Sequence, residues 1–163
     1  MRWSYRLSLK GWANIMELKR ILVSVDGTKM DEDAIELACR LAKLSKGKVY
    51  VTYVIRLDRT LPLNAEVKPE VDKGEMVLDA AERCAENCSY EVITDLLQAR
   101  AVGPALVNEA TERGADLMII SVGYNTRFGE FDVGELVPYV MKNAPCRVIL
   151  LREPVSMKVG SKR

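Results

Sequence analysis

The chain has 163 residues, 48% of them hydrophobic and 29% charged, which fits one globular domain and excludes a disordered tail or a fibre. Its 24 basic and 23 acidic residues give a net charge of +1, and the basic excess lies at the two ends, so the acidic body is a poor match for a nucleic-acid backbone. The sequence contains no histidine, which excludes His-dependent catalytic triads and His-ligated zinc or haem.

The two ends of the chain differ in character from its body. Residues 1–15 mix basic and aromatic residues but lack the apolar run of a signal peptide. We therefore expect an N-terminal extension over 1–15 that is disordered unless its aromatic residues dock on a partner, a domain over 16–152, and a basic C-terminal tail over 153–163. No stretch approaches the roughly 18 apolar residues of a membrane span, so the sequence predicts no membrane partner.

The four cysteines bear on location and on metal binding. With no secretory signal, we expect them to be reduced thiols, which places the protein in the cytoplasm. Cys84 and Cys88 lie four residues apart, on one face of a predicted helix. A metal site there would need Cys39 and Cys146 to converge on them, because no histidine can complete it. Free cysteines are more often small buried residues, and we predict no metal.

Strands and helices alternate along the body of the chain. Short apolar and β-branched runs predict strands over 20–25, 48–55, 90–97, 116–121 and 146–151. Apolar residues at intervals of three and four predict helices over 31–46, 70–88, 104–113 and 135–143. Thr28 or Asp31 is expected to cap the first helix, and Gly47 and Gly114 to end the first and third helices in the left-handed conformation.

The composition of the strands predicts the fold class. Four of the five strands are nearly continuous apolar runs, which is typical of strands buried on both faces. The sequence therefore predicts an α/β fold, a single doubly wound five-stranded parallel sheet sandwiched by helices. In such a sheet the ligand crevice lies at the carboxyl ends of the strands, where the strand order reverses.

Residues that could bind a ligand follow three of these strands. Asp26 comes directly after the first strand, Val54 lies near the end of the second, and Val122 and Gly123 follow the fourth. The loop after Gly123 leads through Gly134 into a helix, an arrangement that can present backbone N–H groups to a phosphate. On the residues alone, Asp26 can equally be a turn residue and the glycines ordinary turn chemistry.

The chain resembles the universal stress proteins from about Glu17 to Arg152. The likeness lies in ILVSVDGT at the first strand, GADLMIISVG before the glycine-bearing loop, and VPYVMKNAPCRVILLR at the end. The resemblance implies an adenosine site near Asp26 and Val54, with Val122 beside the loop, and ATP or another adenine nucleotide as the ligand. It also implies a homodimer through the last strand, 146–151, and that strand is an apolar edge segment that pairing would cover.

The loop departs from the pattern of the nucleotide-binding members. Those members carry a glycine, two residues, a second glycine, nine residues, and then a glycine followed by Ser or Thr. Gly123 matches the first glycine, but Thr126 stands at the second, Gly134 comes after seven residues, and Glu135 replaces the hydroxyl residue. A carboxylate in the first helical turn occupies the positive end that a phosphate needs.

These departures set the functional prediction. We expect a non-catalytic binding or signalling module of the stress response, whose degenerate nucleotide pocket binds ATP weakly or not at all. The alternative is a nucleotide-binding member of the same family, acting as an ATP/AMP switch or a weak ATPase.

Overall fold

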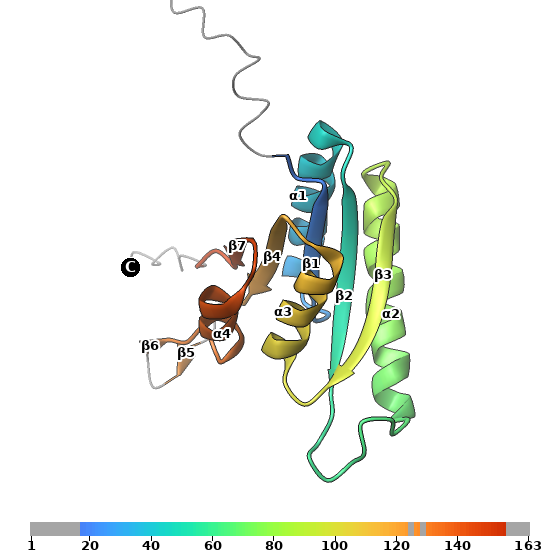
Figure 1. The fold of residues 1–163 in the computed structure, drawn as a ribbon, viewed down its shortest axis with the longest axis vertical. Helices are drawn as coiled ribbons and strands as arrows, with labels where there is room; N and C mark the ends of the chain where they lie inside the picture. The colour runs from blue at the N-terminus through green and yellow to red at the C-terminus, as the bar shows by residue number, and fades with distance from the viewer. Residues whose placement is uncertain (1–16, 124–125, 128–129, 156–163) are drawn as a thin grey trace, which may run out of the picture.

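A computed structural model describes residues 17–123, 126–127 and 130–155. Its centre is a five-stranded parallel sheet in the order β3-β2-β1-β4-β7 (Figure 1). The strands are β1 (Arg20–Val25), β2 (Lys48–Arg56), β3 (Val92–Ala99), β4 (Leu117–Val122) and β7 (Arg147–Arg152). The helices are α1 (Met30–Ser45), α2 (Lys68–Asn87), α3 (Val102–Arg113) and α4 (Leu136–Asn143). The predicted fold class is confirmed.

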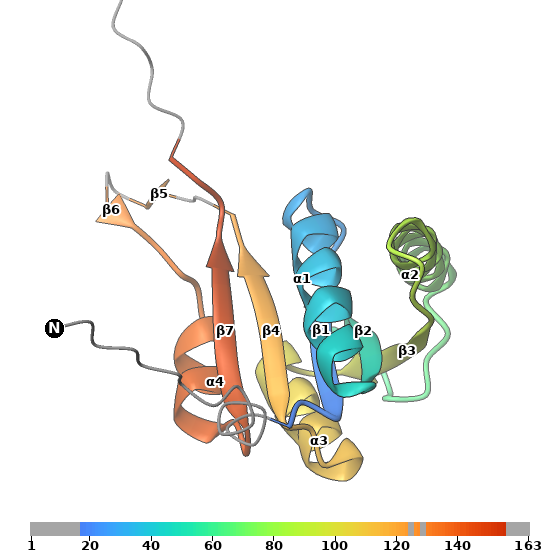
Figure 2. The same ribbon diagram turned by 90° about the horizontal axis from the view of Figure 1, so that it is seen from above.

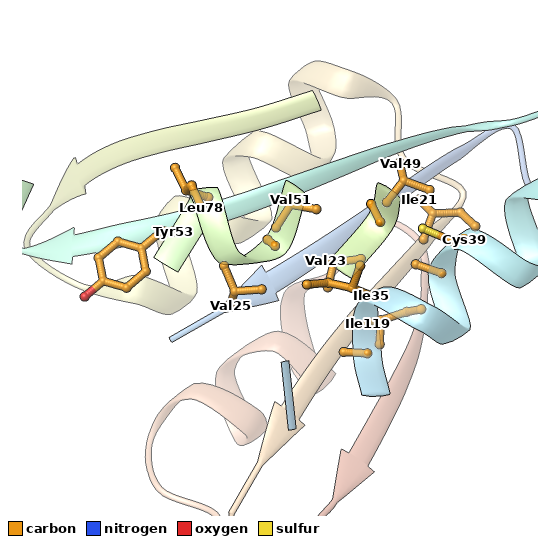
Figure 3. Packing of buried hydrophobic residues seen from close by; sticks show 14 of the residues in the cluster. Ile21, Val23, Val25, Ile35, Cys39, Val49, Val51, Tyr53, Leu78 and Ile119 are labelled. Atoms are coloured by element: carbon orange, nitrogen blue, oxygen red, sulfur yellow. The ribbon is translucent and has the colours of Figure 1, made fainter. Parts of the chain in front are cut away.

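The helices form two layers, one on each face of the sheet. Helices α1 and α2 cover one face, and α3 and α4 cover the other (Figure 2). Successive side chains of β1 alternate between the two layers: Ile21 and Val23 pack under α1, whereas Leu22 packs under α3. The residues of β1 from Ile21 onward are all buried, which explains why its sequence is an apolar run (Figure 3).

The strand order reverses beside β1. The chain proceeds from β1 to β2 and β3 on one side, and then crosses to β4 and β7 on the other. The register places Val25 beside Tyr53 of β2, and Ser24 beside Ile120 of β4. The carboxyl ends of β1, β2 and β4 therefore converge at one edge, where open parallel sheets bind ligands.

Two expectations about the ends of α1 are wrong. The helix begins after Lys29, which makes no side-chain cap, and Asp31 lies inside the first turn with its carboxylate directed to the preceding backbone. The left-handed residue at the other end is Lys46, with φ of 52°, and not Gly47. Gly47 is needed for a different reason, because a Cβ there would lie 2.3 Å from the carbonyl oxygen of Leu18. Gly114 does end α3 in the left-handed conformation, with φ of 59°.

Other boundaries differ by about two residues. Helix α2 and strand β3 cover 68–87 and 92–99, against the expected 70–88 and 90–97. The segment between β4 and α4 contains a short antiparallel pair, β5 (Thr126–Arg127) and β6 (Glu130–Phe131), which sequence patterning did not predict.

The expected extension over 1–15 and most of the tail over 153–163 lie outside the described residues. Among the described helices, none is long and apolar enough to cross a membrane.

Candidate functional site

A small cleft opens where the strand order reverses, on the face covered by α3 and α4. Its volume is about 200 Å³. It is lined by Ser24, Val25 and Asp26 of the first strand and turn, Tyr53 and Val54 of β2, Ser121 of β4, Val102 of α3 and Leu136 of α4. A second cavity of about 520 Å³ shares Val102 and Leu136 with it and extends between the first turns of α3 and α4. The combined volume of the two cavities lies within the range of small-molecule pockets in proteins, roughly 300–1,000 Å³.

The structure brings some of the expected residues together at this edge. Asp26 and Val54 both line the small cleft. Val122 is half-buried and packs into the core beneath α3 and α4, and Gly123 follows it at the end of β4; neither lines the cleft. Glu135 lies on the wall of the larger cavity, to which β2 contributes Arg56. The expected site is thus divided between two adjoining cavities.

Thr126 begins the short strand β5, and its side chain lies outside the described part of the structure. Gly134 lies before α4 with φ of +66°, a conformation that favours glycine.

The loop before α4 provides an acceptor for one of its own backbone donors. The carboxylate of Asp132 accepts the N–H of Gly134, with 2.9 Å between Oδ1 and N. Glu135 follows at the N-cap position without a side-chain cap, and its side chain is exposed. Two carboxylates therefore lie next to the positive end of α4, where a phosphate would otherwise be stabilised.

The turn after β1 is organised by two acids with different roles. The exposed Asp26 accepts the N–H of Thr28 at 3.1 Å, which closes a local Asx turn. Asp31 is only 7% exposed and reaches back from α1 to the same turn. Its carboxylate accepts the N–H groups of Asp26 and Gly27, at 3.1 and 2.7 Å. It also accepts the hydroxyl of Ser121 at 3.4 Å.

Sequence reasoning assigned Asp31 only a capping role. Burial raises the pKa of its carboxyl from 3.8 to about 6, against the opposing effect of the N–H of Gly27. The one signal in the sequence that could have drawn attention to Asp31 is its place in the order of elements: a strand, an Asp-Gly turn, and then an acid at the start of a helix.

A polar network joins the last turn of α3 to β2 and β3, apart from the cleft. Arg113 forms ion pairs with Asp95 of β3 at 2.6 Å and with Glu109 one turn earlier at 2.7 Å. Its guanidinium also lies over the ring of Tyr50, 4.6 Å from the centroid. Glu109 is 8% exposed, so the ion pair with Arg113 is needed to offset the cost of burying its negative charge. The network joins α3 to the sheet and does not line the cleft.

The four cysteines are free thiols and belong to no metal-binding cluster among the described residues. Cys39 points from α1 into the core (Figure 3), and burial raises its pKa to about 11, with the nearby thiols of Cys88 and Cys84 adding to the effect. A buried thiol with a raised pKa is a poor nucleophile, as expected for a structural cysteine.

Both the sequence and the fold of the chain match known proteins. The sequence model of the universal stress protein family matches residues 17–152. The chain is 25% identical over 142 residues to universal stress protein MJ0531 of Methanocaldococcus jannaschii, covering 83% of each. A universal stress protein from Archaeoglobus fulgidus in complex with dAMP superposes with a TM-score of 0.65 at 22% identity, over 83% of this chain and 98% of that one.

A second superposition reaches a plant protein. A universal stress protein family protein from Arabidopsis thaliana with AMP bound has a TM-score of 0.60 at 12% identity, over 84% of this chain and 93% of that one. At these identities the superpositions establish a shared fold.

Proposed function

Because the chain belongs to the universal stress protein family, we propose that it is a non-catalytic binding and signalling module of the stress response, acting in the cytoplasm. Its cleft accepts the adenosine part of an adenine nucleotide, and its loop disfavours a triphosphate. Structures that share its fold have been solved with dAMP, cAMP and AMP, which supports adenine nucleotides as the ligand class.

The adenosine end of the site is formed by the strand ends. Asp26 offers an exposed carboxylate that can accept hydrogen bonds from a ribose or a base. Val54 and Leu136 give the same cleft apolar walls that suit a purine ring. The larger adjoining cavity provides room beyond the 200 Å³ of the cleft itself.

The observation that carries the proposal is the hydrogen bond from the N–H of Gly134 to Asp132. This donor belongs to the backbone that a phosphate would use, and an internal carboxylate already accepts it. Glu135 adds a second negative charge beside the same helix end. If each carboxylate costs about 1 kcal/mol of phosphate binding, the two together weaken ATP binding by about thirtyfold.

Calorimetry with ATP, AMP and adenosine tests this proposal. The native chain is expected to bind ATP no more tightly than AMP. Asp132→Ala and the pair Thr126→Gly with Glu135→Ser are each expected to strengthen ATP binding and to leave adenosine unchanged. Glu86→Ser, which removes an exposed acid from α2, is the matched control for the change in net charge. Tight ATP binding by the native chain, with release of ADP, would favour the alternative of a nucleotide switch or weak ATPase.

We also propose a homodimer through β7. Within the described part of the chain, this strand pairs with β4 and with no second strand, so it forms an edge of the sheet. Leu150 on it is 38% exposed, and an apolar edge of this kind is stabilised when a second copy pairs with it about a two-fold axis. A mass in solution of about twice 18.3 kDa supports the dimer, and a clean monomer at micromolar concentration contradicts it.

A further inference from the structure

The Asp31 carboxylate connects the two strands between which the sheet order reverses. It accepts both N–H groups of the turn that follows β1, and the hydroxyl of Ser121 at the end of β4. No other described side chain bonds to the Asp26 or Gly27 N–H. The position of the Asp26 side chain in the cleft therefore depends on a carboxylate in the first turn of α1, which does not itself line the cleft.

Burial makes this an expensive position for a charge. Asp31 is 7% exposed, and the interactions that favour its ionised form are hydrogen bonds from the backbone N–H groups of Asp26 and Gly27 and from a hydroxyl. A neutral side chain at this position would give a more stable protein. Residues that lower the stability of a protein are often kept because they serve its function. The cost is explained if the ionised carboxylate holds the turn in the geometry that a ligand needs.

We propose that Asp31 is a positioning residue, whose ionised carboxylate clamps the Asp26–Gly27 turn to the end of β4 and thereby sets the geometry of the adenosine-binding cleft. This inference rests on the function proposed above. Asp31 touches no ligand itself, because its carboxylate lies behind the turn that presents Asp26.

The clamp makes the cleft sensitive to mildly acidic pH. The pKa of Asp31 is about 6, so at neutral pH it is ionised and accepts both turn N–H groups. Below that pH it carries a proton, which removes the charge from the acceptor and weakens these bonds. A cavity of about 580 Å³ on the α1 and α2 side reaches Asp31 and provides a route for the proton. The charged groups that face it are Asp26 on the turn, Lys29 and Glu32 at the start of α1, and Asp72 and Lys73 on α2.

Nuclear magnetic resonance tests the clamp without any ligand. The amide resonances of Asp26 and Gly27 are expected to titrate with a midpoint near pH 6 in the native chain, and to stay constant between about pH 5 and pH 8 in Asp31→Asn. This range lies above the ordinary titration of an exposed aspartate. Turn amides that do not titrate in the native chain overturn the clamp.

Adenosine binding tests the link to the site. Adenosine is the probe because it has no phosphate, whose own second pKa near 6 would add a titration. The native chain is expected to lose about tenfold in affinity between about pH 7.5 and pH 5. Asp31→Asn is expected to bind at every pH as weakly as the native chain does at pH 5, and Asp31→Ala more weakly still. Asp33→Asn, an exposed acid in the same helical turn, is the matched control and keeps the native affinity and pH profile.

The two measurements separate the possible failures. Equal adenosine affinity and an equal pH profile in the native chain and in Asp31→Asn overturn the positioning role. If the native chain binds no adenosine at any pH while the turn amides titrate as expected, the proposed function fails and the clamp stands. Asp31→Asn keeps the size of the side chain, so it is expected to fold even if Asp31→Ala does not.

Discussion

Replacing Asp31 by asparagine is expected to stabilise the protein at neutral pH. Burial raises the pKa of this carboxyl from 3.8 to about 6 in the folded state. Between these values the folded state binds more protons than the unfolded state, so the free energy of unfolding falls as pH rises from about 4 to about 6. The stabilisation is fully present below the unfolded pKa and is lost as pH passes the folded pKa.

The size of the effect follows from the shift. About two pKa units correspond to about 3 kcal/mol, which is the cost of the ionised form at pH 7.5 relative to the neutral form. Asparagine avoids this cost and keeps one acceptor oxygen for the N–H of Gly27, which donates the shortest of the three bonds. Because an amide accepts more weakly than a carboxylate, we expect a net gain of about 1–3 kcal/mol.

Urea denaturation at two pH values measures this gain. At about pH 7.5 the midpoint of Asp31→Asn is expected to rise with an unchanged m-value, and at about pH 4 the difference from the native chain is expected to vanish. The exposed Asp33→Asn variant should lose no more than about 1 kcal/mol at pH 7.5, from the helix dipole, and gain nothing at either pH value. If Asp31→Asn is less stable at pH 7.5, the hydrogen bonds to the ionised form outweigh its burial, and the reasoning about this carboxylate is wrong.

Three further changes test the packing and the assembly. Gly47→Ala is expected to cost about 1–3 kcal/mol in urea denaturation, because the added Cβ would lie 2.3 Å from the carbonyl oxygen of Leu18; a neutral effect would refute that contact. Arg113→Ala is expected to lower the free energy of unfolding by about 1–3 kcal/mol, because it leaves the buried Glu109 carboxylate without its cation. If the same change costs nothing in a chain that already carries Glu109→Gln, the carboxylate is the cause of the loss. Leu150→Lys on the β7 edge is expected to give a monomer by light scattering, and an intact dimer would place the interface elsewhere.

The overall fold could be predicted because its signals are strong and regular. Central parallel strands are buried on both faces, so Ile21, Leu22 and Val23 form an apolar run. This signal can be recognised without knowing which helices pack against the strand. The position of Asp26 and Val54 at one edge then followed from the rule that parallel strands end together. These inferences need only the order of elements along the chain.

The contacts of the site depend on long-range geometry that local patterns do not carry. An acid in the first turn of a helix is compatible with simple dipole stabilisation or capping, so the sequence did not reveal that Asp31 is buried and Asp33 exposed. Its bond to Ser121 joins residues 90 positions apart. In the same way, Gly47 was expected to serve the helix end, but the constraint comes from the neighbouring backbone at Leu18.

The central claim is that this chain accepts adenosine and disfavours a triphosphate. The most direct test is the ratio of the ATP and AMP dissociation constants of the native chain, measured by calorimetry under identical conditions. The carboxylates of Asp132 and Glu135 at the start of α4 predict that ATP binds no more tightly than AMP. A native chain that binds ATP ten times more tightly than AMP would contradict the account.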